Sequence, residues 1–385
     1  MVYSLFLIFV GAALFATLAL VARQSLIIGY IVLGIVLGPW GLAWVTDTKL
    51  IEDISTIGII FLLFLLGLNL SPRKLFELLK QTTIVTILTS AVFASVGWAF
   101  ATLAGFNTLN AIIVGVSCMF SSTIIGLKLL PTTVLHHKHT GEVIVSVLLL
   151  QDMIAIVVLL AFQAMSSEQS NTLIELAKLV VLLPVLIGVA WGLKHLVLLK
   201  LFRKFDRIQE YVFLLALAWC LGIAELAYAI GFSHETGAFI AGITIATSPI
   251  ALFISESLKP LRDFFLVLFF FALGAGLNIS ALDQIWVPAL FLGIAMLVIK
   301  PIVFRFALRK VSETNKLGWE TGFRLGQMSE FSLLIVFMAA QSALINDSTV
   351  YFVQLATLVT FIGSSYSIVL RYPTPVAVSD RLRRD

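Results

Sequence analysis

Charged residues are scarce in this sequence: they make up 12% of its 385 residues, against roughly 25% in soluble globular domains. Together with a hydrophobic content of 60%, this scarcity excludes a soluble globular fold. The two cysteines, Cys118 and Cys220, both lie in apolar runs, which excludes a disulfide framework and a CxxC site. A catalytic triad, a P-loop and a zinc motif are also lacking, and Gly274-Ala-Gly276 has no third glycine for a dinucleotide site. We therefore expect neither enzyme activity nor a cofactor.

Apolar runs of about 20 residues recur along the chain, each long enough at 1.5 Å per residue to cross a hydrocarbon core of roughly 30 Å. They predict about thirteen transmembrane helices, at 3–22, 26–42, 52–70, 83–104, 107–130, 142–165, 173–199, 209–230, 235–248, 260–278, 285–309, 318–343 and 349–371. The first run has no basic residue before it and no cleavage pattern behind it, so we expect the first helix of the protein rather than a signal peptide. The predicted fold class is an all-α polytopic membrane protein.

The basic residues predict the orientation of these helices, because Lys and Arg in short loops gather on the cytoplasmic side. Loops after odd-numbered spans contain Arg23; Arg73, Lys74 and Lys80; Lys138; Lys200, Arg203, Lys204 and Arg207; Lys259 and Arg262; Lys310 and Lys316; and Arg381, Arg383 and Arg384. Loops after even-numbered spans contain only Lys49. We therefore expect the N-terminus outside and the C-terminus in the cytoplasm. The net charge of +4 reflects this topology and not binding to nucleic acid.

The chain contains an internal repeat. Gly29-Tyr-Ile-Val-Leu-Gly34 matches Gly237-Ala-Phe-Ile-Ala-Gly242 at an offset of 208 residues, and Gly67-Leu-Asn-Leu-Ser71 matches Gly276-Leu-Asn-Ile-Ser280 at an offset of 209. The matching spans lie seven apart, and an odd number of crossings reverses the direction of the chain. The repeats, roughly 26–165 and 235–371, are therefore predicted to have inverted topology, as in many secondary transporters.

Three charged residues lie near the middle of predicted spans: Asp152, Lys300 and Glu330, with Glu225 as a weaker case. A charge at that depth costs roughly 2.5–3.5 kcal/mol on insertion scales, so we expect these side chains to face the bundle interior or a watery cavity. The structural alternative is that Asp152 and Lys300 form a buried pair that only neutralises itself.

Hydroxyl side chains interrupt the span 107–130, where Ser121 to Thr123 stand midway. Such side chains compete for backbone hydrogen bonds, so the helix can break where neighbours satisfy the freed groups. The offset of 209 maps these residues onto Glu330 to Ser332, and we predict that both spans are interrupted and cross at mid-membrane. Carbonyls at the breaks could bind a cation, and Glu330 or Lys300 could balance the half-helix dipoles. Small residues at an ordinary helix contact are the alternative.

Several motifs together resemble the Kef-type branch of the monovalent cation:proton antiporters, and the resemblance covers essentially the whole chain. The motifs are Gly29-Tyr-Ile-Val-Leu-Gly-Ile-Val-Leu-Gly-Pro39, Phe64-Leu-Leu-Gly-Leu-Asn-Leu70, Ser121-Ser-Thr123, Leu150-Gln-Asp152 and Ser329-Glu-Phe331. The Gln-Asp pair beside a Ser-Ser-Thr break is the most specific of them. The resemblance implies a sodium/proton antiporter-like fold with two crossed broken helices.

The resemblance also implies a site and an assembly. The cation or proton would bind at Asp152 with Gln151, Thr123, Ser122 and Ser121, and Lys300 looks like the lysine that partners the aspartate in related exchangers. A transport domain over 1–371 would have its moving core in the spans 107–130, 142–165, 318–343 and 349–371, and 372–385 would be a short cytoplasmic tail. The protein would be a homodimer, through the spans 3–22 and 209–230, in a bacterial inner membrane.

The sequence departs from relatives at two positions and in length. Many relatives have Glu where this chain has Asn69, and the Asn-Asp or Asp-Asp pair of sodium-exchanging relatives is absent. Kef-type proteins usually continue into a cytoplasmic nucleotide-binding regulatory domain, whereas this sequence stops at Asp385. The loop His136-His-Lys-His139 could sense cytoplasmic pH or bind metal, but a solvated linker is the better interpretation.

We predict a secondary antiporter that exchanges K⁺ for H⁺ by alternating access, with Na⁺ as the second candidate cation. A single carboxylate, Asp152, favours one-for-one electroneutral exchange. A sodium-coupled organic solute carrier would need groups matched to an organic substrate, and none is obvious. A cation channel is disfavoured by a titratable aspartate with a lysine near it. The expected partners are K⁺ or Na⁺, H⁺, the lipid bilayer and a second copy of the chain.

Overall fold

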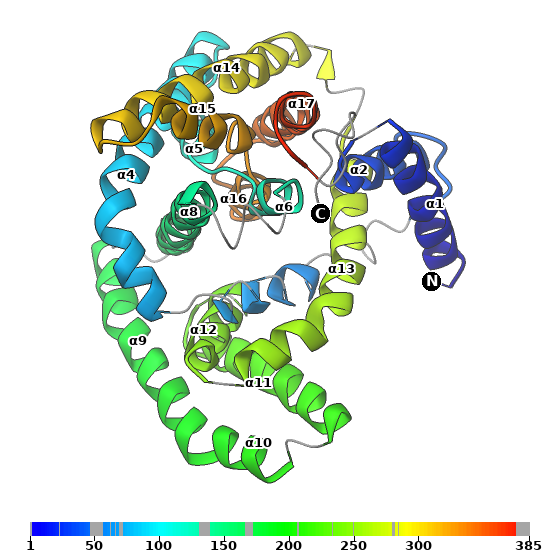
Figure 1. Ribbon diagram of the computed structural model, residues 1–385. Helices are drawn as coiled ribbons and strands as arrows, with labels where there is room; N and C mark the ends of the chain where they lie inside the picture. The colour runs from blue at the N-terminus through cyan, green and yellow to red at the C-terminus, as the bar shows by residue number, and fades with distance from the viewer. Residues whose placement is uncertain are drawn as a thin grey trace. The chain divides into compact units, whose positions relative to one another are not determined.

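The computed structural model describes residues 2–22, 24–46, 57–61, 63–65, 67–68, 72–130, 139–165, 172–205, 208–232, 234–248, 250–278, 282–283 and 285–374. Within these ranges the chain is built almost wholly of helices (Figure 1). They are α1 (Val2–Val21), α2 (Leu26–Leu37), α4 (Pro72–Leu103), α5 (Thr108–Cys118), α6 (Thr123–Lys128), α8 (His139–Met165), α9 (Thr172–Leu193), the π-helix η1 (Lys194–Leu198), α10 (Leu199–Phe205), α11 (Gln209–Ala229), α12 (His234–Ala246), α13 (Ala251–Ala275), α14 (Trp286–Lys310), α15 (Asn315–Arg324), α16 (Glu330–Gln341) and α17 (Asp347–Arg371).

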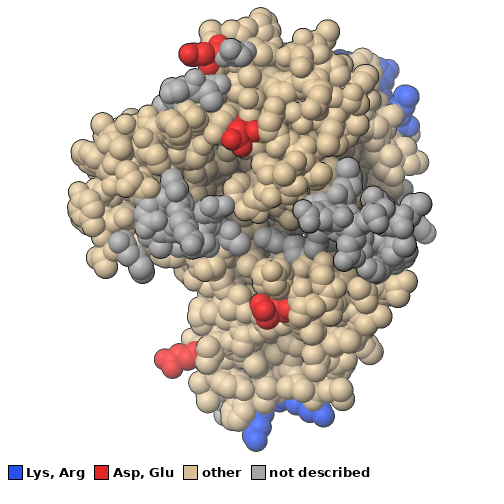
Figure 2. Space-filling view, turned by 180° about the vertical axis from the view of Figure 1, so that it is seen from behind, with Lys and Arg blue, Asp and Glu red and all other residues tan. Residues whose placement is uncertain are grey.

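Seven helical segments in the described ranges are long and apolar enough to cross a membrane. They are Val2–Val21, Thr82–Leu103, His139–Leu159, Val181–Phe205, Gln209–Ala229, Trp286–Lys310 and Asp347–Arg371. Large apolar side chains face outwards from them: Leu14 and Leu18 on α1 are each 61% exposed. Figure 2 shows one face on which most side chains are uncharged. Such surfaces are stable only in lipid, and the protein is a multi-pass membrane protein.

The helices agree with the predicted spans, apart from the third span, of which only 57–61, 63–65 and 67–68 are described. Two helices begin earlier than predicted: α4 begins at Pro72 rather than at 83, and α13 begins at Ala251 rather than at 260. The hydropathy of a segment reports only the part that lies in hydrocarbon. A helix that satisfies its own backbone hydrogen bonds continues into polar surroundings without any change in apolar pattern.

The chain falls into two compact units. Unit 1 comprises Met1–Thr46, Glu77–Ala155 and Leu273–Asp385. Its core joins side chains of α4, α8 and α14, among them Phe93 and Phe304, whose rings meet edge to face with centroids 5.4 Å apart. Helices α5, α6, α15, α16 and α17 also belong to this unit.

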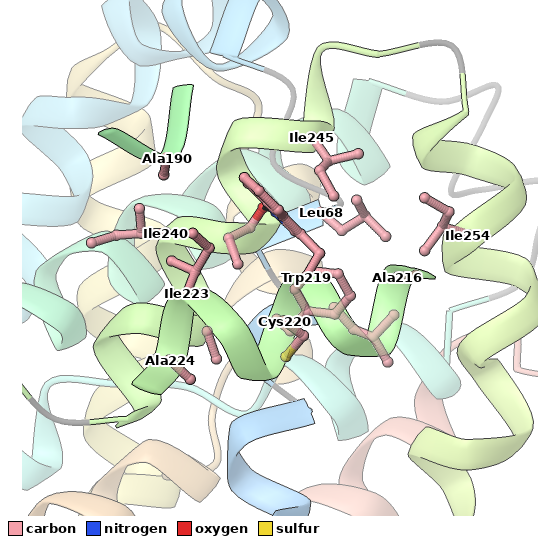
Figure 3. Close-up of a cluster of buried hydrophobic side chains, with 14 of the residues drawn as sticks. Leu68, Ala190, Ala216, Trp219, Cys220, Ile223, Ala224, Ile240, Ile245 and Ile254 are labelled. Atoms are coloured by element: carbon pink, nitrogen blue, oxygen red, sulfur yellow. Dashed lines mark hydrogen bonds between the residues drawn. The ribbon is translucent and has the colours of Figure 1, made fainter. Parts of the chain in front are cut away.

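Unit 2 comprises Asp47–Phe76 and Ile156–Ala272. Figure 3 shows its core, in which Trp219 of α11 lies among aliphatic side chains. The indole Nε1 donates to the carbonyl of Ala241 in α12 at 3.1 Å. Small side chains such as Ala216 and Ala224 on α11 are fully buried there, which allows close helix approach without a hydrophobic driving force from water.

The glycine repeat reappears as a repeated contact. A side chain at Gly67 would collide with the carbonyl of Phe239, and a side chain at Gly274 would collide with the carbonyl of Ile31. Ile31 and Phe239 are 208 residues apart, which is the offset of the repeat, whereas Gly274 lies two residues before Gly276, the repeat equivalent of Gly67. Each lies within a single unit. The two contacts therefore join corresponding pairs of predicted spans, as the sequence repeat leads us to expect.

Candidate functional site

Two helices of unit 1 are interrupted, as the sequence predicts. The first break separates α5, which ends at Cys118, from α6, which begins at Thr123, and the second separates α15, which ends at Arg324, from α16, which begins at Glu330. The breaks lie at 119–122 and 325–329, so Thr123 and Glu330 are already helical, a few residues from the predicted positions. The prediction of two broken helices is confirmed.

Serine side chains cap the helices that follow the two breaks. The Ser122 hydroxyl accepts from the amide of Ile125 at 3.1 Å in the first turn of α6. In the second break Ser329 is the N-cap of α16 and forms a reciprocal capping box with Ser332. Such caps satisfy amide groups that a helix end leaves without a partner. Residues that weaken one helix therefore begin the next.

The breaks cross and bond to each other. The Ser121 hydroxyl donates to the carbonyl of Leu325 at 2.8 Å, and the Ser122 amide donates to the carbonyl of Met328 at 3.1 Å. In return, the Gln327 amide group donates to the carbonyl of Ser122 at 3.2 Å. Irregular backbone at membrane depth is stable only when protein or water satisfies its polar groups. Here each break supplies partners for the other.

Asp152 lies on α8 next to the first break, and only 1% of its surface is exposed. The Thr123 hydroxyl lies 3.4 and 3.5 Å from the two carboxylate oxygens, which makes a weak hydrogen bond. In the described part of the chain no Lys, Arg or His lies within the 4.0 Å of an ion pair with Asp152. A buried carboxylate without a cationic partner is costly, and uptake of a proton or a cation would remove that cost.

Gln151 holds α8 to the first break. Its side-chain oxygen accepts from the Ser121 amide at 3.0 Å, and its side-chain nitrogen donates to the carbonyl of Met119 at 3.2 Å. The side chain is therefore occupied by backbone groups and does not point freely towards a cation. Its observed contacts are those of a positioning residue that fixes Asp152 beside Thr123.

Lys300 does not pair with Asp152 in this structure, contrary to the expectation from sequence. Its ammonium is fully buried on α14 and donates to the carbonyls of Phe120 at 2.6 Å and Gln327 at 2.9 Å. The Ser121 hydroxyl lies at 3.4 Å and the Phe93 ring centroid at 5.0 Å. One carbonyl comes from each break, just beyond the C-terminal ends of α5 and α15. Because these ends carry partial negative charge, they attract the ammonium away from the carboxylate.

Glu330 is the first residue of α16, where a carboxylate is favourable to the positive end of the helix dipole. Its carboxylate interacts electrostatically with Asp152. The Ser329 hydroxyl lies 3.5 Å from one of its oxygens. Glu330 begins α16, and Asp152 lies beside Thr123, the first residue of α6. The N-terminal end of a helix repels a cation, and a carboxylate nearby offsets that repulsion.

Arg324 is a further buried charge that the sequence analysis did not single out, although it lies inside the predicted span 318–343. Its guanidinium is 0% exposed, and Nε and Nη2 both lie 3.1 Å from the same Glu320 oxygen. It also donates to the carbonyls of Leu129 at 2.9 Å and Pro373 at 3.0 Å. The Glu320-Arg324 spacing of four residues inside an apolar span was the available signal.

Other expectations fall differently. Glu225 does not face an interior: its side chain is 73% exposed and lies 3.1 Å from His234, because it stands one turn from the end of α11. His139 lies 2.8 Å from Glu313 and 3.2 Å from Glu142. His136 and Asn69 lie outside the described residues. Cys118 and Cys220 are both buried and free.

The groups beside Asp152 that the structure describes offer oxygen ligands: its own carboxylate, the Thr123 hydroxyl and the Glu330 carboxylate, which interacts with it electrostatically. Hard cations prefer such ligands. In the described part of the chain no group of three His, Cys, Asp or Glu side chains could hold a resident metal ion. The chemistry that the site can perform is the binding of a proton or a small cation on one carboxylate.

Known proteins are similar to this chain in sequence and in fold. Residues 6–372 match the family described as "Sodium/hydrogen exchanger, transmembrane". K(+) efflux antiporter 4 of Arabidopsis thaliana is 30% identical over 348 residues, which cover 87% of this chain and 58% of that protein. K(+) efflux antiporter 6 of Arabidopsis thaliana is 28% identical over 348 residues, covering 87% and 57%. The chain thus spans less than three fifths of the length of these relatives.

A solved structure has a similar fold at low sequence identity. The sodium proton antiporter MjNhaP1 from Methanocaldococcus jannaschii aligns with a TM-score of 0.69 and 17% identity, covering 99% of this chain and 97% of that one. The likeness confirms the predicted architecture, with crossed broken helices in an all-α membrane bundle.

Proposed function

This chain belongs to the sodium/hydrogen exchanger family of transmembrane proteins, and from that premise we propose that it exchanges K⁺ for H⁺ by alternating access at Asp152. Potassium is chosen because the relatives that match over 87% of the chain are K⁺ efflux antiporters, in the Kef-type branch that the motifs resemble. The resemblance to that branch, expected from the motifs, is confirmed by these relatives.

The burial of Asp152 without a cationic partner carries the proposal. A carboxylate that is 1% exposed, with one weak donor from Thr123, is stable when it is protonated or holds a cation. A proton and a K⁺ ion compete for the same carboxylate. If the site opens to each side of the membrane in turn, one is therefore exchanged for the other. Lys300 is held by carbonyls of both breaks and is not needed to discharge Asp152. One proton then replaces one K⁺, and the exchange moves no net charge.

We also propose the moving core, the dimer and the orientation that the family resemblance implies. The moving core would comprise α5, α6, α8, α15, α16 and α17, which all contribute residues to unit 1. Two copies would associate through the exposed apolar faces of α1 and α11, in a bacterial inner membrane with the N-terminus outside. A cytoplasmic nucleotide-binding regulatory domain would be a further partner. Cysteine labelling from each side tests the orientation, and a monomer at all concentrations in mild detergent would contradict the dimer.

Exchange by purified protein in sealed proteoliposomes tests the function. An imposed K⁺ gradient should drive proton movement, and Asp152→Asn should abolish it while the protein stays folded, because the amide keeps the shape but does not titrate. Asp263→Asn is the matched control, since that carboxylate is 54% exposed and pairs with Arg262.

The ionic conditions separate the alternatives. Na⁺ in place of K⁺ decides the cation. Exchange that is unaffected by membrane voltage supports the electroneutral mechanism, whereas current without proton movement would indicate a channel. Exchange by Asp152→Asn at the parental rate would show that Asp152 is not the shared site.

A further inference from the structure

Unit 2 contains a cavity of about 370 Å³ near the end of the α9–η1–α10 helix, next to the turn after α12. Its lining includes Lys194, His195, Phe202, Arg203, Thr247 and Ser248. The volume falls in the range of about 300–1,000 Å³ that is typical of ligand pockets. Three of these side chains are basic and two are hydroxyls, and none is acidic. We refer to it as the Lys194 cavity.

Lys194 is unusual for a lysine, because only 4% of its surface is exposed. Its ammonium donates to the Thr247 hydroxyl at 3.1 Å. In the described part of the chain no carboxylate lies within ion-pair distance of it. An ammonium has three hydrogens to donate, and its burial is costly unless they are bonded and the charge is balanced. The cavity therefore adjoins a buried cation to which the described residues bring no counter-charge.

Arg203 adds a second positive charge to the lining of the cavity, and His195 adds a polar ring. His195 lies 3.0 Å from the carbonyl of Trp191 through Nδ1, so Nδ1 carries the proton and Nε2 is left for another partner. Lys194 and Arg203 are nine residues apart, which in a regular α-helix would place them on opposite faces. The π-helix Lys194–Leu198 widens this turn and rotates the following residues, so that both side chains line one cavity.

We propose that the Lys194 cavity binds a phosphate-bearing anion, as the headgroup of an anionic phospholipid or as a soluble phosphate. An anion there would accept from the Lys194 ammonium and the Arg203 guanidinium, and Thr247, whose oxygen already accepts from Lys194, can donate its own hydrogen. Charge-assisted bonds of this kind are stronger than neutral ones. In Figure 2, Lys and Arg side chains lie at the bottom of the view, at the level where Figure 1 shows α10, the helix that carries Arg203.

The site is tested by binding, independently of cation exchange. Purified full-length chain in a neutral detergent is titrated with inorganic phosphate by calorimetry in one arm. In the other arm it is mixed with phosphatidylglycerol, with phosphatidylcholine as the zwitterionic control, and bound lipid is counted by native mass spectrometry. Binding of phosphatidylglycerol alone identifies a lipid site, and binding of inorganic phosphate identifies a site for a soluble ligand.

Variants of the cavity decide whether the binding occurs there. Lys194→Met keeps the length of the side chain without its charge and should weaken binding at least tenfold, and Arg203→Gln should weaken it several-fold. Lys204→Gln is the matched control, because this neighbouring basic residue lies over the Phe205 ring and does not line the cavity. If Lys194→Met does not fold, Thr247→Val and Arg203→Gln provide the comparison. No binding in either arm, or equal binding by the parent and the folded cavity variants, would overturn the proposal.

Discussion

Replacing Lys300 by Met and Asp152 by Asn, singly and together, measures whether these two buried charges depend on each other. The Lys300 ammonium donates to the carbonyls of Phe120 and Gln327, and Asp152 receives its weak bond from Thr123. Both charges are essentially shielded from water, with residue exposures of 0% and 1%. The sequence suggested an ion pair, whereas the structure places the ammonium on the two breaks.

The two arrangements predict different free energies of unfolding. Lys300→Met leaves two buried carbonyls without their charged donor, at about 1–3 kcal/mol each. Removal of the ammonium recovers part of its burial cost, so we expect a net loss of about 2–4 kcal/mol. Asp152→Asn should change the free energy of unfolding little, because without a cation the carboxyl is protonated and the amide replaces a neutral group of the same shape. Without an ion pair the coupling free energy should stay below about 1 kcal/mol, whereas removing one partner of a buried pair costs about 3–5 kcal/mol.

The assay is denaturant-induced unfolding in detergent, followed by tryptophan fluorescence and carried out without K⁺ or Na⁺ so that no cation occupies the site. Lys310→Met is the matched control, since it makes the same change at the exposed end of the same helix. A coupling of 3 kcal/mol or more between Lys300→Met and Asp152→Asn would show that the two charges pair. It would refute the assignment of Lys300 to the carbonyls of the breaks.

Three further changes test other parts of unit 1 and unit 2. Arg324→Met should lower the free energy of unfolding by about 3–5 kcal/mol, because it leaves Glu320 and two carbonyls without their partner. Arg305→Met removes a half-buried guanidinium that lies over the Trp319 ring and should cost only about 1 kcal/mol or less. Gly242→Ala should destabilise through a collision with the carbonyl of Phe64, whereas Gly188→Ala, with open space around it, should not. Thr123→Val should weaken K⁺ binding about 2- to 10-fold in exchange assays, because the hydroxyl is the group of Thr123 that reaches Asp152. Thr123→Ser keeps the hydroxyl and should restore the binding. Equal KM values for K⁺ in the parent and both variants would contradict this role.

The membrane fold was predictable because the lipid restricts the possibilities. Apolar length indicates each crossing, and glycine-rich segments indicate close helix contacts: at Gly67 and Gly274 the neighbouring backbone leaves room for glycine alone. The same repeat located both helix breaks to within a few residues. Helix ends outside the hydrocarbon, such as the start of α13, were not predictable, because nothing in the apolar pattern marks them.

The candidate site was only partly predictable. Asp152 and the serines of the first break were identified because a charge or a run of hydroxyls inside an apolar span is rare. Arg324 and Lys194 carry the same signal but lie closer to the ends of their spans, where long basic side chains usually reach the interface. In the structure both are buried instead, because neighbouring elements cover them.

By itself the sequence determined the class of the protein and its repeat, and it indicated candidate residues for a proton or a cation, because apolar length, repeat spacing and the cost of a buried charge can be recognised in the sequence. Only the tertiary structure decided which partner each charge takes. Lys300 faces two carbonyls that are 207 residues apart in the chain, those of Phe120 and Gln327, rather than the carboxylate of Asp152. Those carbonyls exist as acceptors only where the two breaks cross, since an unbroken helix would have used them itself.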